Sequence, residues 1–130
     1  MSIHSLIDFI DRHTNNGAIY SHKLWDKSIG IEEESIAFIH EFSGRDWLAL
    51  RSLNLKEKSD LWIECLIDIL DKAYTEDGRQ MIIHIALTGT GENFLTAMEY
   101  IQDFRRDVDI YAWLKLKNRS SEILKNKLNR

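Results

Sequence analysis

The chain contains 130 residues with a mass of 15.3 kDa, and 44% of them are hydrophobic and 29% charged, with a formal net charge of −4. This length suits one domain with one core, and the composition excludes a disordered protein. Cys65 is the only cysteine, which excludes an internal disulfide bond and favours a reducing compartment. The chain has no proline, which favours an almost wholly helical fold because proline breaks helix interiors.

The first 52 residues predict four short helices separated by glycine or asparagine. The first begins at a cap on Ser2 or Ser5 and ends at the Asn-Asn-Gly triplet of residues 15–17. A second helical stretch follows Ser21, and Gly30 is expected to end it. Two further helices are predicted from Ile31 to Phe42 and from Arg45 to Ser52.

The rest of the chain predicts longer helices. Asn54 and Glu57 form a plausible capping box that opens the longest helix, over 55–74. The further helices are expected over 77–88, over 90–104, from Asp107 or Asp109 onward, and from a cap at Ser120 or Ser121. The run MIIHIAL (81–87) could instead form a strand, but we favour a helix because nothing else in the chain offers a strand partner.

These elements predict an all-α protein with one domain, 1–130, of seven to nine short helices. An offset of 34 residues places Gly44-Arg45 on Gly78-Arg79 and Leu61 on Leu95. A helix–turn–helix period of this size is expected of an α-solenoid unit. We therefore expect stacked antiparallel helix pairs, as a HEAT-like α-solenoid or an irregular helical bundle.

The charge is unevenly placed along the chain. Residues 1–104 carry 18 acids and 9 bases, whereas the C-terminal segment 105–130 carries 3 acids and 8 bases. Such an asymmetry suggests charged partners. The basic segment could contact nucleic-acid phosphates, although the acidic remainder would repel a polyanion. We regard nucleic acid as an unfavoured partner.

The sequence predicts no catalytic residue, metal site or cofactor, and we expect a protein that is not an enzyme. The five histidines include no pair at i, i+4 spacing, and no His or Cys cluster has zinc spacing. Cys65 lies among apolar helix residues, which favours a buried thiol over a nucleophile. The Gly89-Thr90-Gly91 turn could bind an anion, but it more simply ends one helix and caps the next.

The N-terminus carries acids among its apolar residues and lacks the basic start of a signal peptide. No apolar run approaches the 18 residues that a membrane span needs. We therefore expect a cytoplasmic protein with no membrane partner.

Five acidic residues on the helix expected over 55–74 form the most informative pattern. At 100° per residue they fall within an arc of about 80°. We call them the acidic stripe: Glu57, Asp60, Glu64, Asp68 and Asp71. Like charges at i, i+4 repel one another, so the acidic stripe is either a solvated face or a docking surface on which a basic partner relieves the repulsion.

Together, residues 44–104 with their DGRQ turn resemble helical-repeat immunity proteins of bacterial contact-dependent growth-inhibition and related polymorphic-toxin systems. Such proteins share no fixed signature, so the resemblance assigns no residue a role. It implies a stoichiometric inhibitor that binds a cognate toxin domain, often a basic nuclease, and blocks its active site or substrate groove. The acidic stripe is then the expected contact surface. The alternatives are a helical adaptor or regulatory module, and a nucleic-acid-binding regulator acting through residues 105–130.

Overall fold

The computed structural model describes residues 2–15 and 29–128, and every regular element in these ranges is helical. The α-helices are α1 (Ser2–Asn15), α3 (Ile29–His40), α4 (Gly44–Arg51), α5 (Asp60–Ala73), α6 (Glu76–Thr88), α7 (Gly91–Ile101) and α8 (Ile110–Leu128). Two 3-10 helices, η1 (Leu55–Glu57) and η2 (Gln102–Asp107), lie before α5 and after α7. The all-α prediction is confirmed, and the MIIHIAL run is part of α6 and not a strand.

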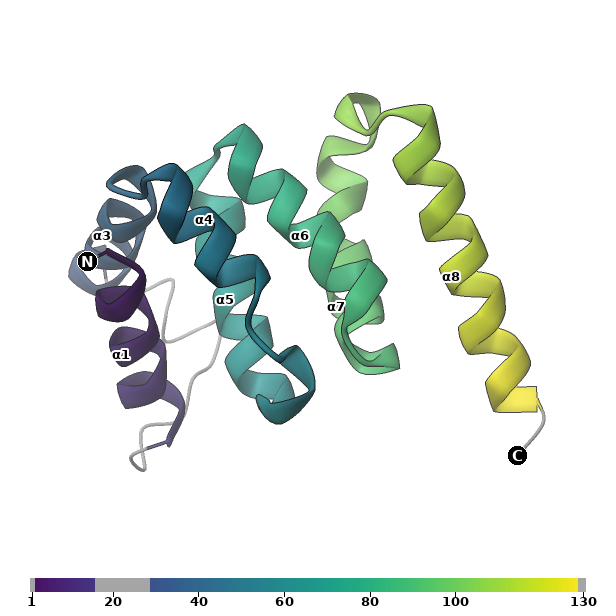
Figure 1. Ribbon diagram of the computed structural model, residues 1–130, viewed down its shortest axis with the longest axis horizontal. Coiled ribbons are helices and arrows are strands. Elements are labelled where there is room, and N and C mark those ends of the chain that lie inside the picture. Colours follow the sequence, from purple (N-terminus) through teal and green to yellow (C-terminus); the bar gives the residue numbers. More distant parts are fainter. Residues whose placement is uncertain (1, 16–28, 129–130) are drawn as a thin grey trace.

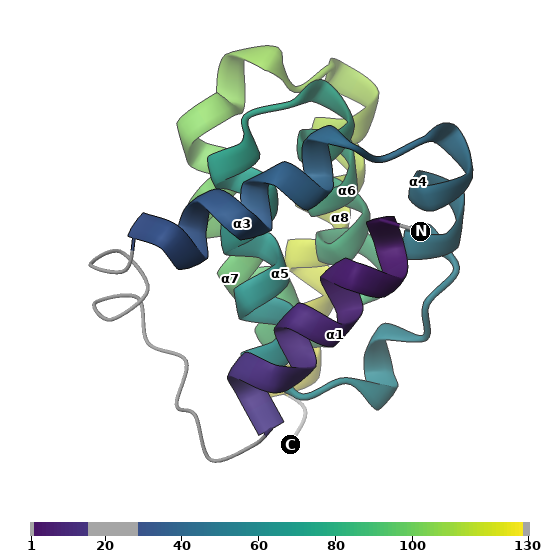
Figure 2. The ribbon, with the colours of Figure 1, turned by 90° about the vertical axis from the view of Figure 1, so that its left-hand side faces the viewer.

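The helices are arranged in two layers. Helices α3, α5 and α7 pack side by side in one layer, and α4, α6 and α8 form the other (Figure 2). Helix α1 closes one end of the stack against α3, α4 and α5, while α8 stands at the opposite end (Figure 1). The chain alternates between the layers from α3 to α8, so each layer contains every second helix.

Contacts within the α3–α5–α7 layer recur at an almost constant sequence separation. His40 Nε2 lies 2.9 Å from the carbonyl oxygen of Ala73, 33 residues later. Asn93 Nδ2 donates to Asp60 Oδ1 at 3.4 Å over the same separation, and the Tyr100 hydroxyl donates to Asp68 over 32 residues. Neighbouring helices of this layer therefore run in the same direction, and one helix pair occupies 32–33 residues. This separation is close to the offset of 34 that the sequence suggests.

Polar side chains decide where the helices begin. The hydroxyl groups of Ser43, Ser59, Thr75 and Thr90 each accept a hydrogen bond from the backbone N–H three residues later, at the starts of α4, α5, α6 and α7. Each satisfies one of the backbone donors that a helix start leaves open. The prediction that Thr90 is a cap is confirmed.

Several predicted boundaries differ from the structure. The helix expected over 55–74 is interrupted, because Asn54 caps only η1 and Ser59 starts α5. The last two predicted helices are one, since α8 continues through Ser120 and Ser121 with no break. Gly30 lies inside α3 and does not end a helix. The helical stretch predicted after Ser21 falls on residues 16–28, outside the described residues.

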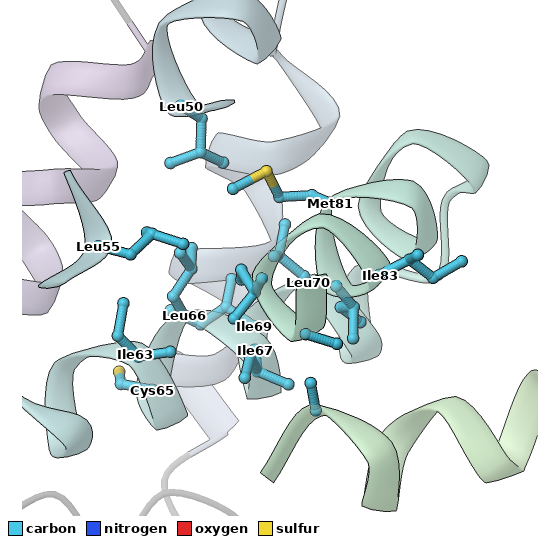
Figure 3. Packing of buried hydrophobic residues seen from close by; sticks show 14 of the residues in the cluster. Leu50, Leu55, Ile63, Cys65, Leu66, Ile67, Ile69, Leu70, Met81 and Ile83 are labelled. Atoms are coloured by element: carbon cyan, nitrogen blue, oxygen red, sulfur yellow. The ribbon is translucent and has the colours of Figure 1, made fainter. Parts of the chain in front are cut away.

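The core lies between the two layers, and α5 supplies much of it. Figure 3 shows side chains from α4, η1, α5 and α6 converging there, among them Leu50, Leu66 and Met81. Trp62 is 2% exposed, and Cys65 is fully buried, as the sequence predicts for this thiol. Burial, followed by the negative charges of nearby Asp68 and Glu64, raises the pKa of the Cys65 thiol. A thiol held in this protonated form is a poor nucleophile.

Candidate functional site

The acidic stripe is less uniform than the sequence suggests. Glu57 lies on η1 and the other four residues on α5, so they do not share one continuous helix. The side chains of Glu57 and Asp60 are exposed, whereas Glu64 and Asp71 are half-buried. The residues of the acidic stripe are therefore not equally accessible, because α7 packs against α5 and its Tyr100 contacts Asp68.

Asp68 is the clearest departure from an exposed stripe, with 2% of its surface accessible. Its Oδ1 atom accepts a hydrogen bond of 3.1 Å from the hydroxyl group of Tyr100, and its Oδ2 atom lies 3.8 Å from Lys72 Nζ. A buried carboxylate needs such partners, since burial without them is costly. Asp68 therefore joins α5 to α7 and is not available to a partner protein.

The acids around Asp71 repel one another. Burial of the Asp71 carboxyl, reinforced by the negative charges of Asp103 and Asp68, raises its pKa above the ordinary value. Asp103 is exposed on η2, and Glu99 is exposed four residues earlier on α7. We define the acidic face by the residues of α5, α7 and η2 that carry accessible carboxylates on this side: Asp60, Glu64, Asp71, Glu99 and Asp103.

The two layers carry opposite charges. Helices α3, α5 and α7 contain nine Asp or Glu residues and one lysine, a net charge of −8. Helices α4, α6 and α8 contain four acids and eight Lys or Arg residues, a net charge of +4. Four of the five residues of the acidic face belong to the first layer, with Asp103 on η2, and most of the basic residues of these six helices belong to the second.

Sequence reasoning missed this segregation, because it divides the charge at residue 104 and not between alternate helices. The signal is present in the sequence as an alternation of acidic and basic helices. It becomes visible only when the helix boundaries and the two-layer arrangement are known.

The described residues contain no group of three or more His, Cys, Asp or Glu side chains placed to hold a metal ion. Among the predicted turns, Gly89 ends α6 and Thr90 caps α7, and the Asn93 side chain accepts the backbone N–H of Thr90. The capping box thus occupies backbone N–H groups that an anion would need at this helix start.

None of the described helices has the length and apolar character that crossing a membrane requires.

Two surface hollows lie on α8. One of about 450 Å³ lies beside the start of α7 and is lined by Asp60, Glu92 and Arg119 among others. Arg119 donates from Nη2 to the Gly89 carbonyl at 2.8 Å, so this arginine fixes α8 to the α6–α7 turn. The other hollow, of about 290 Å³, lies on the basic layer between α4, α6 and α8.

The sequence matches no known protein family, and neither a curated protein nor a solved structure shows significant similarity to it.

Proposed function

We propose that the protein is a non-enzymatic immunity protein of a bacterial polymorphic-toxin system, which acts in the cytoplasm and binds a basic toxin domain through its acidic face. The observation that carries the proposal is the concentration of negative charge on the α3–α5–α7 layer, with nine acids against one lysine. A nuclease toxin must attract an anionic substrate, so its active-site groove is basic. An acidic surface complements such a groove and blocks it.

The environment of Asp71 supports a binding role for this surface. Its raised pKa reflects burial and the repulsion of neighbouring carboxylates, Asp103 above all. A cationic partner relieves this repulsion on binding, so part of the attraction is already built into the free protein. The contact surface proposed here differs from the acidic stripe, because it omits Glu57 and Asp68 and adds Glu99 and Asp103.

The proposal is tested by co-expression with a toxin domain. The gene neighbourhood is searched first for a large secreted protein, and its C-terminal domain is then produced in a bacterial host whose growth is measured. The wild-type chain is expected to restore growth and to bind the purified domain in a one-to-one ratio by calorimetry. Continued killing at full expression of the folded chain would contradict the proposal.

A charge-reversed pair identifies the surface. Glu99→Lys with Asp103→Lys changes two exposed residues of the acidic face and should weaken binding by at least about 100-fold, since each 1.4 kcal/mol is a factor of ten. The matched control is Asp8→Lys with Glu122→Lys, an equal charge change at exposed positions of α1 and α8. Equal losses in the two pairs would show that net charge, and not the acidic face, drives binding.

A further inference from the structure

The two ends of the helix stack expose different kinds of residue. Helix α1 closes one end, and its exposed residues in the described range are all polar: His4, Ser5, Asp8 and Arg12. Helix α8 stands at the other end (Figure 1), where Ile110, Leu114 and Leu124 are 69%, 51% and 60% exposed. The terminal unit of a stacked helical fold needs a polar outer side to stay soluble. The α8 end therefore lacks the polar cover that α1 gives to the opposite end.

The exposed residues of α8 form a stripe that combines apolar and basic side chains. Leu116, which is 1% exposed, and Ile123 lie on the other side of the helix, toward the core. At 100° per residue, the exposed residues of the stripe fall within an arc of about 100°. We call them the α8 stripe: Ile110, Leu114, Lys117, Ser121, Leu124 and Lys125.

Helix α7 carries a complementary pattern at the same end of the stack. Three of its exposed residues fall within an arc of about 60°, and we call them the α7 stripe: Glu92, Leu95 and Glu99. Asn93 and Tyr100, which bond to α5, point to another side of the helix. In the part of the chain that the structure describes, neither the two acids nor the two lysines of these stripes form an ion pair.

The charges of the two stripes lie at matching levels along the helix axes. A Cβ atom built on Gly91 would lie 3.8 Å from Ile123 Cγ2, so the start of α7 is level with this part of α8. The two helices run in nearly opposite directions (Figure 1). With a rise of 1.5 Å per residue, Glu92 is level with Lys125, and Glu99 with Lys117, to within about 5 Å. The flexible four-carbon stem of a lysine side chain covers such a difference.

We propose that this end of the stack binds a second copy of the chain, in a dimer whose two-fold axis runs parallel to α7 and α8. Rotation about this axis keeps every residue at its level and places α8 of each copy beside α7 of the other. Helix α8 stands beyond α7 at this end (Figure 1), so the projecting helix of one copy fits the recessed position of the other. Lys117 and Lys125 then contact the acids of the opposite α7 stripe. The contact is isologous, so each pairing occurs twice.

The contact area is that of a reversible dimer. Helix α8 has 19 residues and is therefore about 28 Å long, and two packed helices cover a width of about 20 Å. Each copy then contributes about 560 Å², and the total of about 1,100 Å² is just above the lower limit for a specific interface.

A second copy fits this end better than a polyanion does. The acids of the α7 stripe would repel an anionic membrane or a nucleic acid, whereas the dimer pairs them with lysines. The inference goes beyond the proposed function and is tested without a toxin. Of the acidic face it uses Glu99 alone.

The first test measures the mass of the full chain by sedimentation equilibrium, from low micromolar to near-millimolar concentration. The wild-type chain is expected to show a monomer–dimer equilibrium with a Kd in the micromolar range, as its small interface implies. Leu124→Glu places a charge in the α8 stripe and should weaken dimerisation by at least about tenfold. The matched control is Leu48→Glu, because Leu48 is 66% exposed on α4, away from this end, and should leave dimerisation unchanged. Equal losses in the two variants would overturn the proposal.

Charge exchange gives a sharper test. Lys117→Glu with Lys125→Glu sets acids against acids, and Glu92→Lys with Glu99→Lys sets bases against bases. Each double variant alone should dimerise at least about tenfold more weakly than the wild type. An equimolar mixture of the two should dimerise again, because every pairing in the mixed dimer joins opposite charges. Far-UV circular dichroism of both variants verifies that the fold is retained.

Net charge alone predicts a different result. Each Glu→Lys exchange adds two charges, so the second double variant changes the formal net charge from −4 to 0. If repulsion between whole molecules controlled association, this variant would dimerise more strongly than the wild type. Such an increase would overturn the proposal.

Two further results would also overturn it: a wild-type chain that stays monomeric at the highest concentration, and a mixture of the double variants that stays monomeric. A monomeric chain that sediments with phosphatidylglycerol vesicles, and no longer does so after Lys117→Glu with Lys125→Glu, would assign the α8 stripe to an anionic membrane instead.

Discussion

The hydroxyl group of Tyr100 donates a hydrogen bond of 3.1 Å to the carboxylate of Asp68, and this contact joins α7 to α5 inside the protein. Tyr100→Phe removes the donor and leaves a buried carboxylate less well satisfied. The expected loss in the free energy of unfolding is about 1–3 kcal/mol. Tyr111→Phe is the control, because this exposed side chain should change stability by less than about 0.5 kcal/mol. Urea unfolding of both variants measures the difference, and equal stabilities would contradict the prediction.

The same contact changes how the acidic stripe can be tested. Reversal of Asp68 to lysine places an unmatched positive charge in a site with 2% exposure. Removing one partner of a buried charged pair costs about 3–5 kcal/mol, which is a large part of the stability of a small domain. Loss of binding in Asp68→Lys would therefore report unfolding, whereas Glu99 and Asp103 can be reversed at the surface.

Asp11 and Trp62 connect α1 to α5 over 51 residues of sequence. The indole Nε1 of Trp62 donates to Asp11 Oδ1 at 2.8 Å, and Trp62 is otherwise buried. Asp11→Ala leaves this N–H without its acceptor and should lower the free energy of unfolding by about 1–3 kcal/mol. Asp11→Asn retains a carbonyl oxygen and should recover most of the loss. Asp8→Ala, on an exposed position one turn earlier, should have almost no effect in the same unfolding experiment.

Cys65 should make the protein sensitive to alkaline pH. Its folded-state pKa is raised by burial, above the value of about 8.5 for a free thiol. The unfolded chain therefore loses the thiol proton as pH rises through that value, while the folded chain keeps it. This stabilising contribution is complete below the unfolded pKa and decreases between that value and the folded pKa.

Comparison with Cys65→Ala isolates this effect, because Tyr100, whose pKa burial also raises, is present in both proteins. Between pH 8 and pH 10 the wild type should lose about 2 kcal/mol more than Cys65→Ala does. Denaturant unfolding at a series of pH values measures both slopes. Parallel curves would show that the thiol ionises equally in both states.

Local patterns predicted much of the fold, and long-range contacts account for what they missed. The apolar residues at helical spacing gave the all-α class, and Thr90 marked the start of α7. Helix α5 was extended too far, since both Asn54 and Ser59 are good caps and only packing decides which one opens the long helix. The burial of Asp68 depends on Tyr100, 32 residues away, and helical periodicity contains no information about that neighbour. The structure therefore buries one of the five residues of the acidic stripe, and the contact surface itself stays a prediction.

Gly44 and Gly78 give a final comparison, because the offset of 34 aligns them while their surroundings differ. Gly44 is the first residue of α4, and a Cβ atom built there meets nothing within 4 Å. Gly78 is buried in the first turn of α6, where a Cβ atom would lie 2.9 Å from Thr75 Oγ1 and 3.1 Å from the backbone oxygen of Leu70. Replacement of glycine by alanine lowers the conformational entropy of the unfolded chain equally at both positions.

The two alanine substitutions should therefore have opposite effects. Gly44→Ala should stabilise the protein by about 0.4–1 kcal/mol, because the native backbone accepts the methyl group without strain. Gly78→Ala should destabilise it by about 1–3 kcal/mol, because α6 must move away from the end of α5 to relieve the contact with Leu70. Thermal unfolding by circular dichroism measures both changes. A higher melting temperature for Gly78→Ala would show that the packing of α5 against α6 is looser than the structure describes.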